Sequence, residues 1–335
     1  MITAKESRRQ APDWQRELAQ AITDPAELLR ELRLDPALLP AARAAAARFP
    51  LRIPRGFVAR MARGDPHDPL LRQVLPLAAE LVATPGFVAD PVGDQAALTA
   101  PGVLHKYPGR ALLIVTGACA VHCRYCFRRD YPYAEAHAGL EGWRPALAYL
   151  AADATIQEAI LSGGDPLSLS NQRLQPLLAG LNQIPHLRRL RLHSRQPVVL
   201  PARIDPGLLA LLAGIRLQPV LVIHANHPRE LDEAVCAALA RLAAAGVTLL
   251  NQSVLLRGVN DSVEVLASLS EALFAAGVLP YYLHLLDPVQ GAAHFDVNEI
   301  EASVIMARLR QRLPGYLVPR LVRERPGQWA KTPVC

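Results

Sequence analysis

The stretch Arg110-Ala-Leu-Leu-Ile-Val-Thr-Gly117 and the motif that follows it, Cys119-Ala-Val-His-Cys123-Arg-Tyr-Cys126, decide the fold class of this chain. The first stretch is an apolar run with β-branched residues that ends at a glycine, which is typical of a buried strand. The motif has the spacing C-x3-C-x2-C, with an aromatic residue directly before the last cysteine. A buried strand therefore leads straight into a loop of metal-ligating side chains.

The same unit, a short apolar strand followed by a helical pattern, recurs along the rest of the chain. We expect strands at residues 110–117, 158–164, 188–194, 219–226, 247–256 and 280–286. Six successive β/α units predict parallel strands with right-handed crossovers, and therefore an α/β fold built as an open or closed barrel. In such folds the chemistry lies at the carboxyl ends of the strands. Polar residues stand at those ends here: Cys119 to Cys126, Ser162 to Asp165, His193 to Arg195, His224 and Asp287.

Residues 1–100 have a different pattern, with helices separated by prolines. The helical stretches cover residues 13–22, 24–34, 36–49 and 68–81. Asp24 before Pro25 and Asp35 before Pro36 have the pattern of a helix N-cap followed by the first helical residue. We therefore divide the chain into an N-terminal helical region at 1–100, a β/α core at 101–315 and a C-terminal segment at 316–335.

Composition limits the classes of protein. Of the 335 residues, 51% are hydrophobic and 20% are charged, which supports a large core. No apolar run reaches the roughly 18 to 20 residues of a membrane helix, and the polar opening is not a secretory signal. We therefore expect a cytoplasmic protein with no membrane partner. The net charge is +6, but the arginines are scattered and aromatics make up 5%, so a solvated surface is favoured over nucleic-acid binding.

Three of the five cysteines lie within eight residues, which is typical of a metal site in a reducing compartment and unlike a disulfide framework. Three thiolates can hold three irons of a [4Fe-4S] cluster and leave the fourth iron open for another ligand. The alternatives are a zinc site with His122 or His137 as the fourth ligand, and three thiols without a metal. Zinc is disfavoured because structural zinc sites usually pair their ligands as two closely spaced couples.

The cysteine motif after the first strand resembles that of the radical S-adenosylmethionine (radical SAM) superfamily. The resemblance implies a partial (β/α)6 barrel, here with an N-terminal helical region. It also implies that the open iron binds S-adenosyl-L-methionine, which an electron from the cluster cleaves to methionine and a 5′-deoxyadenosyl radical. The segment Ser162-Gly163-Gly164-Asp165 resembles the glycine-rich segment that receives the methionine amino group. Glycine suits such a position because it lets a ligand approach backbone carbonyls closely.

The rest of the chain resembles the lysine 2,3-aminomutase family. Matching segments lie in family order between residues 105 and 333, among them Ile-Leu-Ser-Gly-Gly-Asp-Pro-Leu and Lys-Thr-Pro. The opening helices and the short C-terminus resemble the subgroup that makes (R)-β-lysine, which a separate ligase attaches to elongation factor P. The resemblance implies an isomerase that uses pyridoxal 5′-phosphate together with the cluster and S-adenosylmethionine. It implies free lysine as the substrate and an electron donor such as flavodoxin.

The same resemblance assigns roles to four residues of this chain. Lys331 matches the lysine that attaches pyridoxal phosphate, since a primary amine captures an aldehyde. Arg128 matches the arginine that pairs with the substrate carboxylate, for which a planar guanidinium is suited. Asp287 and Glu324 match two carboxylates that hold the ε-ammonium of lysine, although the family's second carboxylate is an aspartate. The segment before Lys331 reads Pro-Gly-Gln-Trp-Ala, where the family is glycine-rich.

Further positions follow from the resemblance with less detail. His224 and Gln252 match positions near the adenosyl group, and Lys106 and Arg110 are candidates for binding the phosphate of pyridoxal phosphate. Cys236 lies in a helical stripe of alanine and leucine, so we expect it to pack in the core. Two other functions stay open: a radical SAM enzyme that modifies RNA or protein, and a noncatalytic metal-bearing RNA-binding module.

Replacement of Cys119, Cys123 or Cys126 by alanine is expected to abolish cluster assembly, because three ligands leave no spare. Cys236→Ala is the control, and we expect it to keep the iron content of the wild type. Iron and sulfide analysis after anaerobic reconstitution measures both. A Cys123→Ala protein with wild-type iron content would contradict the cluster assignment.

Overall fold

The computed structural model describes residues 13–136 and 143–334. Its strands form one ten-stranded sheet, in the order β1 to β10. The six predicted strands are confirmed, and each lies parallel to the next: β3 (Arg110–Thr116), β4 (Glu158–Gly163), β5 (Arg189–Ser194), β6 (Gln218–Ile223), β7 (Thr248–Val254) and β8 (Leu279–His284). The α/β class is therefore confirmed. Because β1 and β10 stand at opposite ends of the order, the sheet is an open, partial barrel.

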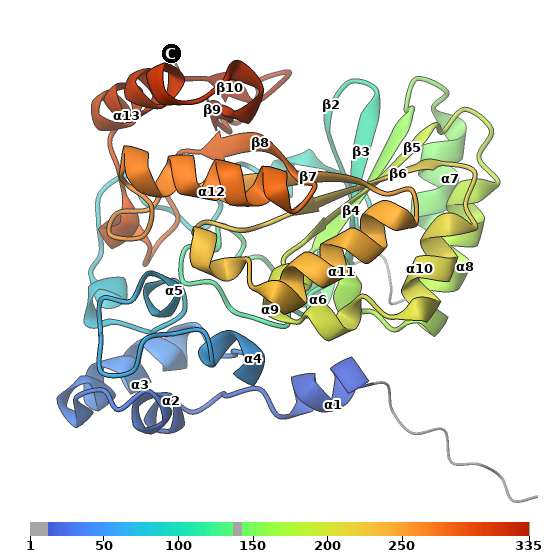
Figure 1. Cartoon of the computed structure of the whole chain (residues 1–335). Helices are drawn as coiled ribbons and strands as arrows, with labels where there is room; N and C mark the ends of the chain where they lie inside the picture. The colour runs from blue at the N-terminus through green and yellow to red at the C-terminus, as the bar shows by residue number, and fades with distance from the viewer. Residues whose placement is uncertain (1–12, 137–142, 335) are drawn as a thin grey trace, which may run out of the picture.

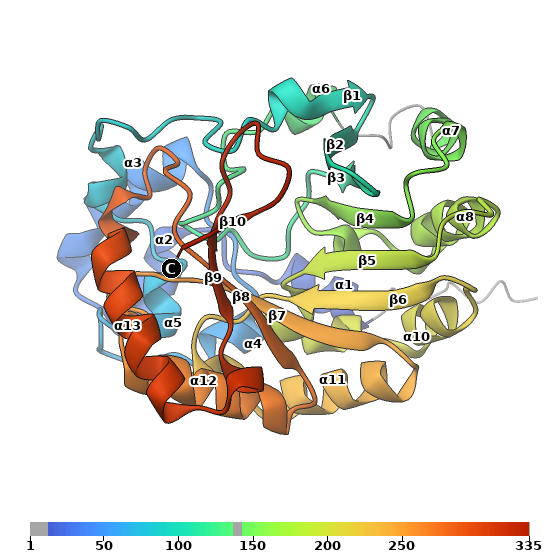
Figure 2. The ribbon, with the colours of Figure 1, turned by 90° about the horizontal axis from the view of Figure 1, so that it is seen from above.

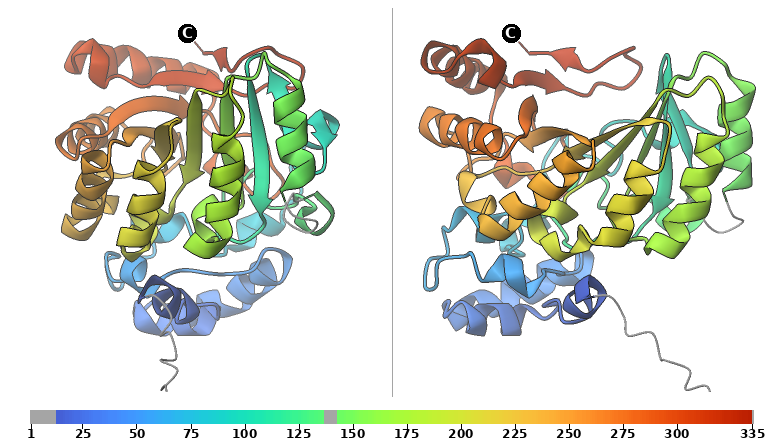
Figure 3. Two further views of the ribbon diagram at one scale, coloured as in Figure 1. Left: turned by 90° about the vertical axis from the view of Figure 1, so that its right-hand side faces the viewer. Right: turned by 45° about the vertical axis from the view of Figure 1, so that its right-hand side comes forward.

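Helices between the parallel strands form a layer on the outer face of this sheet (Figures 2 and 3). They are α7 (Arg144–Ala152), α8 (Asn171–Asn182), α10 (Pro206–Ala213), α11 (Glu233–Ala244) and α12 (Val263–Ala275), as the helical patterns predict. Four of them begin at a side chain that accepts a hydrogen bond from a backbone N–H of the first turn, namely Ser170, Asp205, Asp232 and Ser262. The short helices α6 (Tyr133–Ala136) and α9 (Gln196–Val199) follow β3 and β5.

Four strands at the two edges of the sheet were not predicted. Strands β1 (Leu98–Ala100) and β2 (Val103–Tyr107) form an antiparallel edge beside β3. After α13 (Glu299–Arg312), strand β9 (Arg320–Arg323) lies parallel to β8, and β10 (Thr332–Pro333) pairs antiparallel with β9. These strands are too short to show a clear alternation of apolar and polar residues. Their consequence is that residues from the far end of the chain reach the side of β8 (Figure 2).

The N-terminal helices lie below the sheet, at the end opposite to α13 and β10 (Figure 1). They are α1 (Asp13–Ala19), α2 (Pro25–Glu31), α3 (Leu39–Arg48), α4 (Arg55–Val58) and α5 (Pro69–Arg72). Both predicted caps are confirmed: Asp24 accepts from the Ala26 N–H at 3.0 Å, and Asp35 from the Ala37 N–H at 2.8 Å. The single predicted helix at 68–81 is wrong, because α5 ends before Pro76, which cannot continue a helix.

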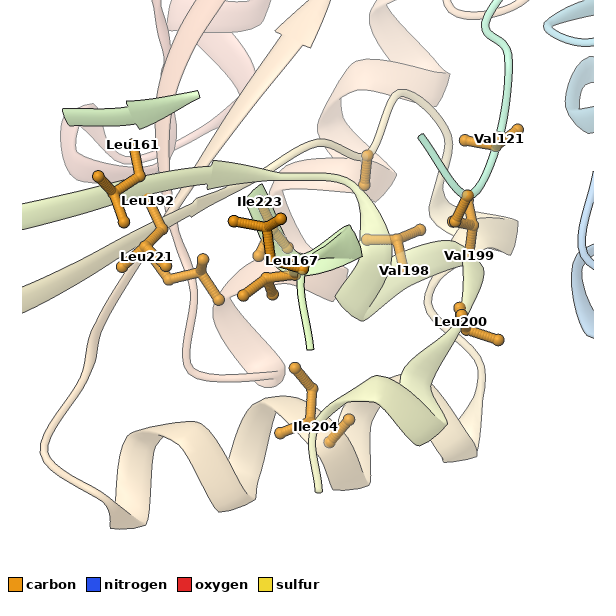
Figure 4. Close-up of a cluster of buried hydrophobic side chains, with 14 of the residues drawn as sticks. Val121, Leu161, Leu167, Leu192, Val198, Val199, Leu200, Ile204, Leu221 and Ile223 are labelled. Atoms are coloured by element: carbon orange, nitrogen blue, oxygen red, sulfur yellow. The ribbon is translucent and has the colours of Figure 1, made fainter. Parts of the chain in front are cut away.

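One hydrophobic cluster joins these helices to the sheet, running from Trp14 of α1 to Val278 before β8. Figure 4 shows part of it, with Leu161, Leu192 and Leu221 of neighbouring strands together with Val121 from the cysteine loop. The loop that carries the cysteines is therefore anchored in the main core. Among the described residues, no helix has the length and apolar character needed to cross a membrane.

Two glycines bring the loop after β4 against the loop after β3. Gly163 has a φ of +119°, and a Cβ there would lie 2.5 Å from the Thr116 carbonyl oxygen. A Cβ on Gly164 would lie 2.6 Å from the carbonyl oxygen of Ala118, the residue before Cys119. Since both obstacles are backbone atoms, a side chain can be accommodated only if the loop moves. The two glycines therefore fix the position of the cysteine loop.

Gly164→Ala is expected to lower the free energy of unfolding by about 1 to 3 kcal/mol, because the added methyl overlaps a backbone carbonyl. Gly315→Ala is the matched control, since a Cβ there meets nothing within 4 Å. Chemical denaturation of both variants measures the difference. Equal stabilities would show that the two loops are not held in this close approach.

Candidate functional site

A cavity of about 720 Å³ lies where the parallel strands, the cysteine loop and the segment after β9 meet. All thirteen residues predicted from the sequence line this one cavity, although they come from distant parts of the chain. Their functional roles stay predictions, but their assembly is a property of the fold. They are Cys119, Cys123, Cys126, Arg128, Ser162, Gly163, Gly164, Asp165, His224, Gln252, Asp287, Glu324 and Lys331.

The three cysteines of the motif lie in one wall of the cavity. Burial raises the pKa of Cys119 well above its usual range and that of Cys126 to about 11. Without a metal these two thiols therefore keep their protons, and a metal that binds them has to displace those protons. Three soft donors facing a cavity fit an iron–sulfur cluster with one iron left open.

The zinc alternative depended on a nearby histidine. The Nδ1 of His122 lies 2.9 Å from the Pro50 carbonyl oxygen, and its ring lies against Phe49 at a tilt of 31°, with centroids 5.3 Å apart. His137 lies outside the described residues. Within the described part of the chain, no three His, Cys, Asp or Glu side chains are placed to hold a single metal ion.

The Ser162–Asp165 segment is held mainly by hydrogen bonds that other residues of the chain donate to it. The Asp165 carboxylate accepts from the Ser194 hydroxyl at 2.8 Å and from the Arg195 N–H at 2.8 Å, and burial raises its pKa. The Tyr133 hydroxyl donates to the Gly163 carbonyl at 2.9 Å. Asp165 therefore ties the loop after β4 to the loop after β5, which is a structural contribution that the sequence did not indicate.

Asp94, a buried carboxylate that no sequence motif singles out, lies beside Arg128. The Arg128 Nε is 2.6 Å from Asp94 Oδ2, and the Lys106 Nζ is 2.6 Å from Asp94 Oδ1. Burial alone would raise the pKa of Asp94, but these two cations lower it below its usual value. Asp94 therefore holds Arg128 in place as a charged pair. Its position, in a loop before the first strand, carries no motif.

Glu324 lies between two lysines of the chain itself. Its carboxylate is 3.0 Å from the Lys106 Nζ and 3.1 Å from the Lys331 Nζ. Although burial opposes it, the two lysines lower the pKa of Glu324 to about 2. The Lys331 Nζ also lies 3.4 Å from His284 Nε2 and 5.7 Å from the centre of the Tyr282 ring. Burial lowers the pKa of His284 well below its usual range, so this imidazole is neutral.

Asp287 is the exception among the acidic residues of the cavity. It is half-buried just past β8, and its Oδ1, which is buried, has no hydrogen-bond partner among the described residues. Burial raises its pKa to about 7, even though Lys331 acts in the opposite direction. A buried carboxylate oxygen without a partner is costly. The site therefore has an acceptor that a cationic ligand would satisfy.

The remaining predicted residues are placed as follows. His224 Nε2 lies 3.0 Å from the Tyr125 hydroxyl, and burial lowers the pKa of His224 to about 3. Gln252 of β7 lines the cavity. Cys236 was predicted to pack in the core, but it is half-buried on α11, with its Sγ 3.8 Å from the Leu231 carbonyl, and so lies at the margin of the core.

The chain is similar to two proteins named L-lysine 2,3-aminomutase. The one from Escherichia coli K12 is 54% identical over 323 residues, 96% of this chain and 94% of that protein. The one from Haemophilus influenzae Rd is 48% identical over 324 residues, 97% of this chain and 96% of that protein. No family model matches the chain. Among solved structures, a radical SAM methyltransferase from Sphaerobacter thermophilus covers 66% of this chain and 68% of its own, at 18% identity and a TM-score of 0.46, which supports no argument.

The stability of the cofactor-free protein is expected to depend on pH through Asp287. Its pKa of about 7 lies above the usual value of 3.8, so the stability that protonated Asp287 contributes is lost as the pH rises through 7. Asp287→Asn removes the buried charge at every pH. We therefore expect this variant to melt at a higher temperature than the wild type at pH 8, and the gap to shrink at pH 5. A gap that is the same at both values would contradict the raised pKa.

Glu324→Gln provides the contrast, because the pKa of Glu324 is lowered to about 2 from 4.5. Its contribution is present above pH 4.5 and is lost as the pH falls through 2. The variant should therefore melt below the wild type at both pH 8 and pH 5. A Glu324→Gln protein more stable than the wild type at pH 8 would show that the two lysine contacts do not stabilise the site.

Proposed function

The chain belongs to the L-lysine 2,3-aminomutase family, whose members are radical SAM isomerases, and on that premise we propose that it converts free L-α-lysine to (R)-β-lysine. The observation that carries the proposal is the buried Oδ1 of Asp287, which has no hydrogen-bond partner among the described residues and lies in the cavity that Lys331 and the three cysteines also line. A terminal ammonium is the group that this carboxylate lacks. Lysine supplies one at the end opposite to its α-carboxylate.

The residues that would hold the cofactors all face the cavity. Cys119, Cys123 and Cys126 would ligate a [4Fe-4S] cluster, with His224 and Gln252 beside S-adenosylmethionine, and Lys331 would attach pyridoxal 5′-phosphate. When bound, these groups supply a radical that removes hydrogen from C3 of lysine and a carbonyl that takes up its α-amino group. The protein supplies position, charge and exclusion of water.

Lys331 is held by the contacts that its chemistry requires. Glu324 fixes its Nζ at 3.1 Å, and His284 Nε2 lies 3.4 Å from the same nitrogen. An ammonium is not a nucleophile, so Lys331 has to lose a proton before it can react with a carbonyl. The neutral imidazole of His284 would orient this nitrogen by accepting a hydrogen bond from it, while its lowered pKa makes it unsuited to taking up the proton itself.

The charges of the cavity are complementary to the two ends of lysine. Arg128, oriented by Asp94, would face the α-carboxylate, and Asp287 would face the ε-ammonium. Glu324 is paired with Lys331 in the free protein. Glu324 also contacts Lys106, and it would be the second carboxylate near the substrate ammonium.

The phosphate of pyridoxal phosphate has two candidate partners. Lys106 is neutralised by Asp94 at 2.6 Å and Glu324 at 3.0 Å. Arg110 lines the cavity with its guanidinium 4.6 Å from the centre of the Tyr107 ring. We therefore assign the phosphate to Arg110 and a structural charge to Lys106.

The destination of the product follows from the subgroup that the chain resembles. From the resemblance of the opening helices to that subgroup we propose that a ligase transfers the β-lysine to elongation factor P. As the electron donor we propose a protein such as flavodoxin. The test of the whole proposal is anaerobic reconstitution of the protein with iron, sulfide, pyridoxal phosphate and S-adenosylmethionine, followed by lysine turnover. Chiral chromatography of the product should give (R)-β-lysine. A fully reconstituted protein that leaves lysine unchanged would overturn the proposal.

Asp287→Asn is expected to lower kcat/KM for lysine at least about tenfold, or roughly 1.4 kcal/mol, because the ε-ammonium loses its charged partner. Asp130→Asn is the matched control, since Asp130 is exposed and lies outside the cavity. The wild type should also prefer lysine over norleucine, which has the same carbon chain without the terminal ammonium. Equal turnover of the two amino acids would refute the charge pairing, even if the radical chemistry stood.

A further inference from the structure

A buried polar cluster beside the cysteine loop contains Arg195, which lines the same cavity and to which neither the motifs nor the proposed reaction gives a role. The Arg195 guanidinium donates to the Cys123 sulfur at 2.8 Å and to the Tyr125 hydroxyl at 2.7 Å, both from Nη1. Its side chain is only 7% exposed. A positive charge therefore lies directly against one of the three cysteine ligands, in a region that water does not screen.

Hydrogen bonds hold Arg195 in this position both at its guanidinium and at its backbone N–H. Its Nη2 is 3.0 Å from Glu230 Oε2 and 2.6 Å from Gln73 Oε1. Its backbone N–H donates to Asp165 at 2.8 Å. The Glu230 side chain is fully buried and fixed by the backbone N–H groups of residues 226 and 227 at 2.9 and 3.1 Å. The guanidinium cannot swing away from Cys123 without breaking several buried hydrogen bonds.

A fixed charge at this point acts on electron transfer to the cluster. The reduction potential of an iron–sulfur cluster depends on its net charge, on hydrogen bonds to its sulfurs and on burial. Reduction adds a negative charge, which a nearby guanidinium stabilises and a nearby carboxylate destabilises, most strongly where the dielectric constant is low. Arg195 and Glu230 therefore act in opposite directions, and Arg195 is the one in contact with the sulfur.

We propose that Arg195 is a positioning residue that sets the reduction potential of the cluster through its hydrogen bond to Cys123, and that Glu230 moderates this effect. The proposal rests on the proposed function only in requiring that the chain holds a cluster. Cleavage of S-adenosylmethionine begins with an electron from that cluster, so Arg195 would determine how strong a reductant the enzyme needs. Among the hydrogen bonds of the described residues, Cys123 is the one of the three cysteines whose sulfur accepts from Arg195.

The test compares cluster midpoint potentials in the full-length, reconstituted protein by redox titration monitored with electron paramagnetic resonance. Arg195→Gln removes the positive charge and should shift the potential to more negative values. We expect about a tenfold loss in the equilibrium constant for reduction, which is about 59 mV for one electron. Glu230→Gln removes the negative charge at similar side-chain volume and should shift the potential to more positive values.

The opposite signs of the two expected potential shifts distinguish this role from a purely structural one. Arg203→Gln is the matched control, because Arg203 is also fully buried but donates to the Leu167 and Leu169 carbonyls, at 2.6 and 3.0 Å. It should lower the melting temperature and leave the potential unchanged. Shifts of the same sign in Arg195→Gln and Glu230→Gln, or no shift in either, would overturn the proposal.

If Arg195→Gln retains no cluster, the sign of the shift in midpoint potential of Glu230→Gln decides the test. Failure of both variants to assemble a cluster while Arg203→Gln assembles one also counts against the proposal, since a residue that tunes a potential has to be dispensable for assembly. A wild-type protein that takes up no cluster would instead refute the proposed function. A normal cluster without lysine turnover would refute the reaction and leave the present inference standing.

Discussion

A series of alternating charges, buried at Arg128 and Asp94 and half-buried beyond them, ties the cavity together. Arg128 pairs with Asp94, Asp94 with Lys106, Lys106 with Glu324, and Glu324 with Lys331. These residues come from the cysteine loop, the segment before β1, strand β2 and the end of the chain. Each charge would be expensive to bury alone, so each is stable only because the next one is present. The antiparallel edge β1–β2 and the added strands β9–β10 are the parts of the fold that bring this series together.

The parts of the fold that could be predicted are those with local signals. Six parallel strands, their connecting helices and the caps at Asp24 and Asp35 follow from apolar periodicity and from the chemistry of helix starts. Pro76 is also a local signal, and it explains why the stretch at 68–81 is not one helix. Strands β9 and β10 carry no such signal. They have four and two residues, which are too few to show an alternation of apolar and polar side chains, and their pairing depends on β8 being in place.

The site was predictable where residue type alone limits the chemistry. Three clustered cysteines by themselves indicate a metal site, whereas Lys331 was found only by resemblance to a family. Asp94 could not be found, because its importance lies in two partners that are distant in sequence. Asp287 and Glu324 were assigned one shared role, yet the fold pairs Glu324 with two lysines and leaves an oxygen of Asp287 without a partner. Sequence specifies a carboxylate at each position, and only the packing decides which of the two is available to a ligand.

The short pairing that holds Lys331 also determines how that residue moves. Strand β10 joins the sheet through two residues opposite β9, and Val334 adds a backbone hydrogen bond to Leu321 at 3.0 Å and a place in the second apolar cluster. Few contacts have to break for this edge to open, so its local opening equilibrium is separate from the unfolding of the barrel. The lysine is thus held by a short edge strand next to one buried valine, and the exposed Trp329, two residues before Lys331, is a fluorophore that would report local opening of this edge.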